Sequence, residues 1–233
     1  MSERRPVSEL RVVLVGATGL VGRAVKERAV GLSGVRLAAL ARREVSLPRG
    51  ARMEMYLSDP AHWAERIAAL RPDGVICALG TTWRKAGQDE AAFRAVDQAL
   101  VLEVAQAARQ AGVRQFIAVS AVGANAMNRN RYLRVKGEME DALARMKFTR
   151  LDILRPGLLR GRRVDDPRPA ERLAMLASPL VDLLLHGSWR KYRSISARDM
   201  ASAIWALSQE KAAGRFVHDY DGLRRAARKG ATL

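Results

Sequence analysis

An apolar run that breaks into three evenly spaced glycines constrains this chain more than any other feature. The run Val12–Val15 is typical of a parallel strand covered by helices on both faces, and Gly16, Gly19 and Gly22 follow it. A helix that begins at Leu20 turns its unpaired N–H groups and its positive dipole end toward the glycines, which suits an anion such as a dinucleotide pyrophosphate. The spacing G-x-x-G-x-x-G differs from the common fingerprint, so a purely structural strand-to-helix turn is the alternative interpretation. The cofactor contacts expected here come from Gly16, Thr18, Gly19, Leu20, Val21 and Gly22.

Apolar runs alternate with helical patterns along the first two-thirds of the chain. We expect strands at 11–16, 35–41, 52–57, 74–79, 115–120 and 149–154, and helices at 20–29, 60–70, 90–111 and 131–146. This alternation predicts right-handed βαβ units, and therefore an α/β fold with a doubly wound parallel sheet in one domain over 1–233. A helix at 198–210 and a strand at 214–217 close the fold. The irregular stretch of about 158–195 is expected to form a substrate-covering insertion over the carboxyl edge of the sheet, where open α/β folds bind ligands.

The net charge of +17 is the one unusual bulk property of the 233 residues. Such a charge is typical of proteins that bind nucleic acid or acidic membrane surfaces. The basic residues are scattered, however, and only seven of the 41 are lysines, a skew that coding bias explains as well as function does. Local concentrations at 160–163, 190–193 and 224–229 lack the interleaved aromatic residues of a base-stacking platform. We therefore expect no nucleic-acid partner.

Several other classes are disfavoured by what the sequence lacks. No apolar run reaches 18 residues, so we expect no membrane span, and Met1–Pro6 does not resemble the start of a signal peptide. Cys77 cannot form an internal disulfide and lies in an apolar run, which fits an inert core residue in a reducing cytoplasm. His62, His186 and His218 lack metal-ligand spacing, so we expect no metal site. The expectation is a cytoplasmic monomer or homodimer.

A tyrosine and a lysine four residues apart form the second informative pattern. On a helix over 131–146, Tyr132 and Lys136 share one face. A phenol has an ordinary pKa near 10; a neighbouring ammonium lowers that pKa and makes the tyrosine a usable general acid. Ser120 ends the strand at 115–120, so its hydroxyl lies at the carboxyl edge and could hold a substrate oxygen as charge develops. The alternative is a solvated helix face, because this spacing is frequent by chance.

These patterns resemble those of the short-chain dehydrogenase/reductase superfamily, and more narrowly its atypical branch with the Tat-interacting-protein oxidoreductase group and its bacterial relatives. The similar segments are Gly16–Gly22, Cys77–Thr82, Lys85–Gly87, Tyr132–Glu138 and Arg155–Gly157, within residues 11–222. The resemblance implies a Rossmann fold that binds NAD(P). It also implies that Tyr132 donates a proton, that Lys136 binds the nicotinamide ribose and that Ser120 orients a carbonyl. Further cofactor contacts are implied for Leu79, Gly80, Thr81, Tyr132, Lys136 and Pro156.

Two positions depart from the superfamily pattern. Asp97 stands where the superfamily often has an asparagine that completes a proton relay, and Tyr56 stands where relatives usually have an aspartate that holds the adenine. At the end of the second strand, Arg42 and Arg43 occupy the place where a carboxylate would bind the ribose 2′-hydroxyl of NAD. Guanidinium groups match a 2′-phosphate instead, so we expect NADP rather than NAD. Two solvated arginines are the alternative.

The sequence therefore predicts an NADP-dependent oxidoreductase that acts on a carbonyl-like group of an unidentified small molecule. A protein that binds NADP for regulation or sensing without turnover is the second interpretation. A basic nucleic-acid-associated protein is the third.

Overall fold

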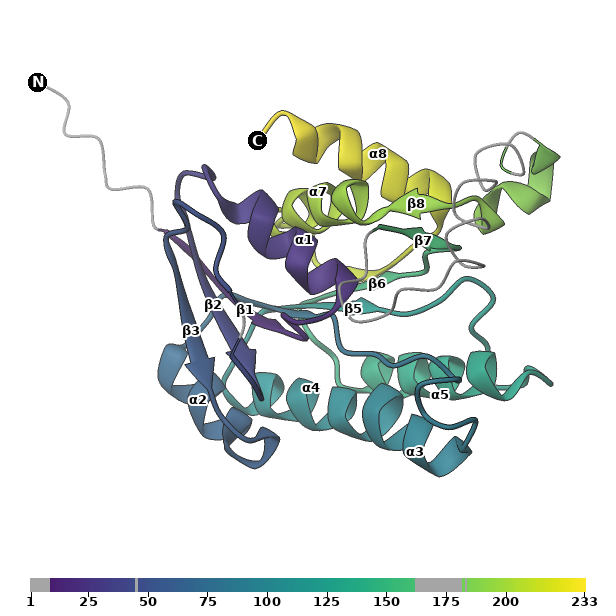
Figure 1. The fold of residues 1–233 in the computed structure, drawn as a ribbon, viewed down its shortest axis with the longest axis horizontal. Helices are drawn as coiled ribbons and strands as arrows, with labels where there is room; N and C mark the ends of the chain where they lie inside the picture. The colour runs from purple at the N-terminus through teal and green to yellow at the C-terminus, as the bar shows by residue number, and fades with distance from the viewer. Residues whose placement is uncertain (1–8, 45, 162–181, 183) are drawn as a thin grey trace, which may run out of the picture.

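The computed structural model describes residues 9–44, 46–161, 182 and 184–233. Its centre is a seven-stranded sheet in the order β3-β2-β1-β4-β5-β6-β9, with every neighbouring pair parallel (Figure 1). The strands are β1 (Leu10–Val15), β2 (Val35–Ala41), β3 (Met53–Leu57), β4 (Gly74–Cys77), β5 (Gln115–Val119), β6 (Arg150–Leu154) and β9 (Gly214–His218). The predicted doubly wound α/β sheet is confirmed.

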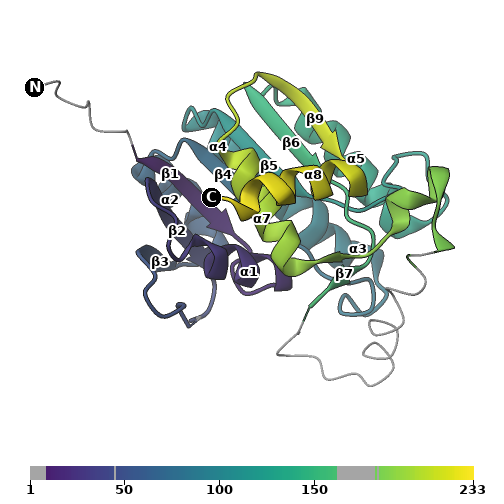
Figure 2. The same ribbon diagram turned by 90° about the horizontal axis from the view of Figure 1, so that it is seen from above.

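Helices cover both faces of this sheet (Figures 1 and 2). One face carries α1 (Leu20–Ala29), α7 (Ala197–Ser208) and α8 (Tyr220–Ala231), and the other carries α2 (Trp63–Leu70), α4 (Leu100–Gln110) and α5 (Arg131–Arg145). Each face has its own apolar core. The unbroken apolar strands follow from this double cover, because their side chains are buried whichever way they point. No helix within the described ranges is both long and apolar enough to cross a bilayer.

Three parts of the chain differ from the expected pattern. The predicted helix at 90–111 is made of α3 (Glu90–Arg94), a π-helical turn η2 (Ala95–Ala99) and α4. The predicted helix at 60–70 begins as a 3-10 turn, η1 (Pro60–His62), in which the carboxylate of Asp59 accepts a hydrogen bond from the Ala61 amide. Only parts of the expected covering insertion can be described: the parallel pair β7 (Leu159–Arg160) and β8 (Ile195–Ser196), and the 3-10 helix η3 (Gly187–Tyr192). Residues 162–181 and 183 of that insertion lie outside the described residues.

The strand order places a ligand crevice at one point of the sheet. From β1 the chain adds β2 and β3 on one side and β4, β5 and β6 on the other. In open α/β sheets, ligands bind beyond the carboxyl ends of the strands at this reversal of order. The glycine turn after β1 and the segment after β4 both lie there.

Candidate active site

The glycine turn is shaped by close backbone contacts. Gly16 has a φ of +88°, and a Cβ on it would lie 2.5 Å from the carbonyl carbon of Ala78. A Cβ on Gly22 would lie 2.2 Å from the Gly16 carbonyl oxygen. These two positions therefore require glycine for the fold itself. A Cβ on Gly19 would meet nothing closer than 3.5 Å. The protein's own packing does not explain Gly19, whereas close approach of a ligand to this turn would.

The segment after β4 lies against the glycine turn and is tied to a buried carboxylate. The amide of Thr81 donates a hydrogen bond of 2.7 Å to Oδ2 of Asp97. A Cβ on Gly80 would lie 3.3 Å from Oδ1 of the same carboxylate. Asp97 is fully buried and lies in the π-helical turn η2. Single π-helical turns within α-helices occur frequently at functional sites, and here the turn carries the buried carboxylate that contacts the strand end.

Asp97 also forms a buried ion pair with Lys136 of α5. The Lys136 Nζ lies 2.7 Å from Asp97 Oδ1, and the side chains are 4% and 1% exposed. The same Nζ lies 3.4 Å from the carbonyl oxygen of Val119, the last residue of β5. Burial disfavours the charged form of Lys136, but the charges of Asp97 and Tyr132 and the hydrogen bond to Asp97 together more than compensate, so the pKa of Lys136 is raised above its ordinary value. Lys136 is thus a permanently charged group at the carboxyl ends of β4 and β5.

Tyr132 lies one helical turn before Lys136 and is held by aromatic packing. Its ring centroid is 5.3 Å from that of the buried Phe93, and Phe93 in turn meets Trp83 edge-on at 5.6 Å. Burial raises the pKa of the Tyr132 phenol above its ordinary value; Lys136 opposes this shift and Asp97 adds to it. Lys136 lowers this pKa as expected, but the net shift is upward because desolvation exceeds the attraction of an ammonium that Asp97 already pairs.

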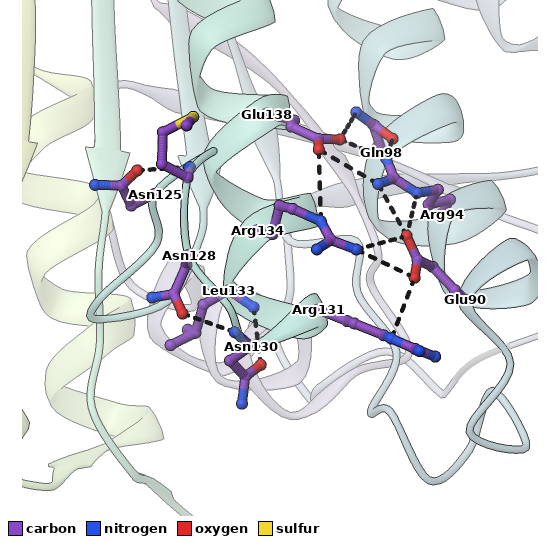
Figure 3. A network of polar contacts seen from close by, with 11 residues as sticks. Glu90, Arg94, Gln98, Asn125, Asn128, Asn130, Arg131, Leu133, Arg134 and Glu138 are labelled. Atoms are coloured by element: carbon purple, nitrogen blue, oxygen red, sulfur yellow. Dashed lines mark hydrogen bonds and ion pairs between the residues drawn. The ribbon is translucent and has the colours of Figure 1, made fainter.

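Ion pairs fix the start of α5 against α3 and η2 (Figure 3). Arg94 contacts the carboxylates of both Glu90 and Glu138, and Arg134 contacts the same two carboxylates. The side chain of Asn130 begins the helix by accepting a hydrogen bond from the Leu133 amide. These contacts hold the helical turn that carries Tyr132 against the element that carries Asp97.

Ser120 lies at the carboxyl edge as predicted, directly after β5, but its hydroxyl is engaged. It donates to Oε1 of Glu140, a residue 1% exposed on α5. The Glu140 carboxylate also accepts two hydrogen bonds from Nε of Arg155, at 3.0 and 3.1 Å. Tyr132 and Glu140 are eight residues apart on α5, so they are separated by about 12 Å along the helix axis. The structure therefore brings Tyr132 and Lys136 together with Asp97, and holds Ser120 beside Glu140.

The remaining predicted contacts lie around the crevice. Pro156 is buried after β6, and its carbonyl accepts a hydrogen bond of 3.0 Å from the Val122 amide. Arg42 and Arg43 are exposed just beyond the end of β2. Tyr56 lies within β3, and its hydroxyl donates to Glu54 of the same strand.

Sequence reasoning missed two parts of this arrangement. The first is the Glu140–Arg155 pair. Glu140 is 15 positions from Arg155 and 20 positions from Ser120, and no sequence pattern connects residues at these separations. The second is Lys26 of α1, whose side chain is buried and whose Nζ lies 3.3 Å from the carbonyl of Ser46. Burial, followed by the charge of Arg23, lowers the pKa of Lys26. This lysine ties the loop after Arg42 and Arg43 to the helix that follows the glycine turn.

Comparison with known proteins agrees with this geometry. The model of a family described as NAD(P)H-binding matches residues 16–211. The chain is 33% identical over 214 residues to the protein fmp52, mitochondrial, of Emericella nidulans, which covers 87% of this chain and 91% of the relative. It is 34% identical over 214 residues to the corresponding Aspergillus niger protein, with the same coverage of 87% and 91%.

Solved structures share the fold at lower sequence identity. A putative NAD-dependent epimerase/dehydratase from Bacillus halodurans superposes with a TM-score of 0.66 at 22% identity, covering 94% of this chain and 99% of that one. MoeE5 in complex with UDP-glucose and NAD gives a TM-score of 0.66 at 17% identity, covering 89% and 75%.

These comparisons overturn one expectation and establish the family. The prediction of a cytoplasmic protein is wrong, because the curated relatives are named as mitochondrial proteins. The single buried cysteine, Cys77, does not distinguish these compartments. The family match covers most of the chain and agrees with the glycine turn and with the sheet order. The chain therefore belongs to the NAD(P)H-binding family.

Proposed function

We propose that this protein binds NADP(H) and reduces a carbonyl-like group on a small molecule, with Tyr132 as the proton donor. The observation that supports this most is the buried Lys136–Asp97 ion pair at the carboxyl edge of the sheet, one helical turn from Tyr132. A buried charged pair contributes little net stability compared with apolar packing. Perturbed ionisable groups at a crevice are typical of functional sites.

The crevice fits a dinucleotide on the protein's own geometry. Gly19 leaves open the space that a Cβ would fill, at the start of α1, where unpaired amides favour a pyrophosphate. Lys136 would reach the nicotinamide ribose, and Arg42 and Arg43 would reach a 2′-phosphate. NADP(H), when bound, supplies or takes up a hydride. The other residues assigned to its binding are Gly16, Thr18, Leu20, Val21, Gly22, Leu79, Gly80, Thr81, Tyr132 and Pro156.

The chain's own residues supply the proton and the positive charge. Tyr132 donates its phenolic proton to the substrate oxygen as negative charge develops there. Lys136 stabilises the phenolate that remains, and Asp97 keeps Lys136 charged and pointed at the strand ends. Ser120 enters this proposal as a positioning residue. The carbonyl-orienting role that the family resemblance implies would require its hydroxyl to release Glu140.

That engagement of Ser120 favours a second candidate, a protein that binds NADP for regulation or sensing without turnover. In this candidate the Lys136–Asp97 pair serves only to hold the nucleotide, and the raised pKa of Tyr132 has no catalytic consequence.

Replacement of Tyr132 by phenylalanine distinguishes the two candidates. The change removes one hydroxyl and keeps the ring that packs on Phe93, so NADPH affinity, measured by calorimetric titration, should hardly change. Turnover of a panel of aldehydes, ketones and quinones should fall by about 10²–10⁴-fold, the usual contribution of a positioned general acid. Undiminished NADPH oxidation by Tyr132→Phe would exclude this role, and a parent protein inactive on the whole panel would favour the binding candidate.

Lys136→Met provides the matched comparison. It removes the ammonium while keeping a long side chain, and should weaken both NADPH binding and any turnover, because the same charge is assigned to the ribose and to the phenol. If both properties are unchanged in a folded Lys136→Met protein, the proposed site is wrong.

A further inference from the structure

A second charged site lies away from the glycine turn, between η3 and the start of α8. These two elements pack against each other and line an open groove of about 460 Å³. Volumes of this size are typical of small-molecule sites. The groove is lined by Arg190, Arg193, Tyr220, Asp221, Arg224, Arg225 and Arg228.

The groove carries a strong excess of positive charge. Five arginines line it and one aspartate faces them. Asp221 pairs with Arg190, its Oδ1 lying 2.6 Å from Nη2, and Arg224 pairs with Asp199 at 2.7 Å. The hydrogen bond from Arg190, followed by the charges of Arg190, Arg225 and Arg193, holds the pKa of Asp221 below its ordinary value.

The arginines converge on the groove from both of its walls. Asp221, Arg224, Arg225 and Arg228 recur at three- and four-residue spacing, so they share one face of α8. From the other wall, Arg193 is oriented by the hydrogen bond of 2.8 Å that its Nε donates to the Leu185 carbonyl. Arginine side chains this close repel one another, and a bound polyanion would relieve that repulsion.

We propose that this groove binds a small molecule carrying two or more phosphoryl groups. Guanidinium groups donate paired hydrogen bonds that match phosphate oxygens. The limited size of the groove and the convergence of two walls favour a compact ligand over an extended nucleic acid, which would need a longer basic track. The proposal is independent of the nucleotide assigned to the glycine turn.

Calorimetric titration with inorganic tripolyphosphate tests the proposal. It is performed on the full chain with and without excess NADPH, because the glycine turn is itself assigned to a pyrophosphate. The groove variant is Arg225→Ser/Arg228→Ser, which removes two exposed groove arginines. The matched control is Arg145→Ser/Arg215→Ser, which removes two exposed arginines from α5 and β9 and changes the net charge equally. Thermal unfolding of both variants checks that they are folded.

We expect saturable tripolyphosphate binding that the groove variant weakens by about tenfold or more and the control variant leaves nearly unchanged. Equal weakening in both variants would show a bulk charge effect and overturn the proposal, as would a parent protein with no saturable binding.

Single-stranded DNA and vesicles containing anionic lipid are tested in parallel. Anionic vesicles would use the exposed rings of Trp189 and Tyr192. If single-stranded DNA or anionic vesicles bind in a way that depends on Arg225 and Arg228, and tripolyphosphate does not bind, the proposal is also overturned. Failure of NADPH to bind would count against the proposed function alone.

Discussion

At the scale of single residues, Asp97 changes what the Tyr132–Lys136 pattern means. The pattern by itself suggests an ammonium that lowers the pKa of a phenol. Burial disfavours the phenolate of Tyr132, and Asp97, which lies 2.7 Å from that ammonium, opposes the effect of the ammonium on the phenol. The phenol is therefore held in its protonated form, which suits proton donation during reduction better than proton removal during oxidation.

A pH profile tests this interpretation. Because the pKa of Tyr132 is raised above its ordinary value near 10, the phenol stays protonated throughout the neutral range. The kcat for carbonyl reduction should then be flat to about pH 9 and fall only above it, whereas kcat for the reverse oxidation should rise with pH. Steady-state rates in both directions measure this. A reduction rate that falls with a midpoint near neutral pH would contradict it.

Ser120 allows a second test at this scale. Its hydroxyl donates to the buried carboxylate of Glu140, and hydrogen bonds to charged groups contribute about 1.5–3 kcal/mol. Ser120→Ala should therefore lower the free energy of unfolding by about that amount in denaturant titrations, and reduce kcat less than Tyr132→Phe does. If unfolding is unchanged and kcat falls as far as in Tyr132→Phe, Ser120 acts directly on substrate.

At the scale of elements, periodicity predicted where most strands and helices lie but not how one helix is interrupted. The observed bounds of α1 and β2 are those expected from the sequence. The π-helical turn η2 was not predicted, because its one-residue irregularity leaves the apolar pattern of the flanking helices intact. The helix α8 was also not predicted, although its buried residues Leu223 and Ala227 have the four-residue spacing of an amphipathic helix.

The glycine turn gives a matched pair of substitutions at this scale. Gly22→Ala places a Cβ 2.2 Å from the Gly16 carbonyl oxygen, so it should lower the free energy of unfolding by about 1–3 kcal/mol and weaken NADPH binding as well. Gly19→Ala meets nothing closer than 3.5 Å, so the free energy of unfolding should fall by no more than about 1 kcal/mol, the usual cost of alanine at a helix N-cap, while NADPH affinity falls about tenfold or more. Denaturant unfolding and calorimetry separate the two effects. If the Gly19→Ala protein binds NADPH normally, the assignment of a pyrophosphate to this turn is wrong.

At the scale of the whole molecule, chain order predicted the sheet because each βαβ unit has one favoured hand. The site was predicted in part: the glycine turn, Tyr132 and Lys136 lie along the carboxyl edge as expected. The contacts of Ser120 and the ion-pair network between α3 and α5 depend on side-chain directions across distant elements, which periodicity does not determine. The distribution of the +17 charge was also not predicted. The sequence shows basic clusters at 190–193 and 224–229 but does not show that they meet in one groove, which depends on η3 packing against α8.

The choice of nucleotide is a property of this whole assembly, because it depends on how the end of β2 is held relative to α1. Arg42 and Arg43 follow β2, and Lys26 anchors their loop through the Ser46 carbonyl. Each charge-assisted hydrogen bond to a 2′-phosphate contributes about 1.5–3 kcal/mol, and 1.4 kcal/mol corresponds to tenfold in affinity. NADPH should therefore bind at least about tenfold more tightly than NADH, and Arg42→Ala/Arg43→Ala should remove most of that preference with little effect on NADH. Calorimetric titration of both nucleotides into both proteins measures it, with Arg145→Ser/Arg215→Ser as the control for net charge. Equal affinities of the parent protein for NADPH and NADH would refute the assignment of these arginines.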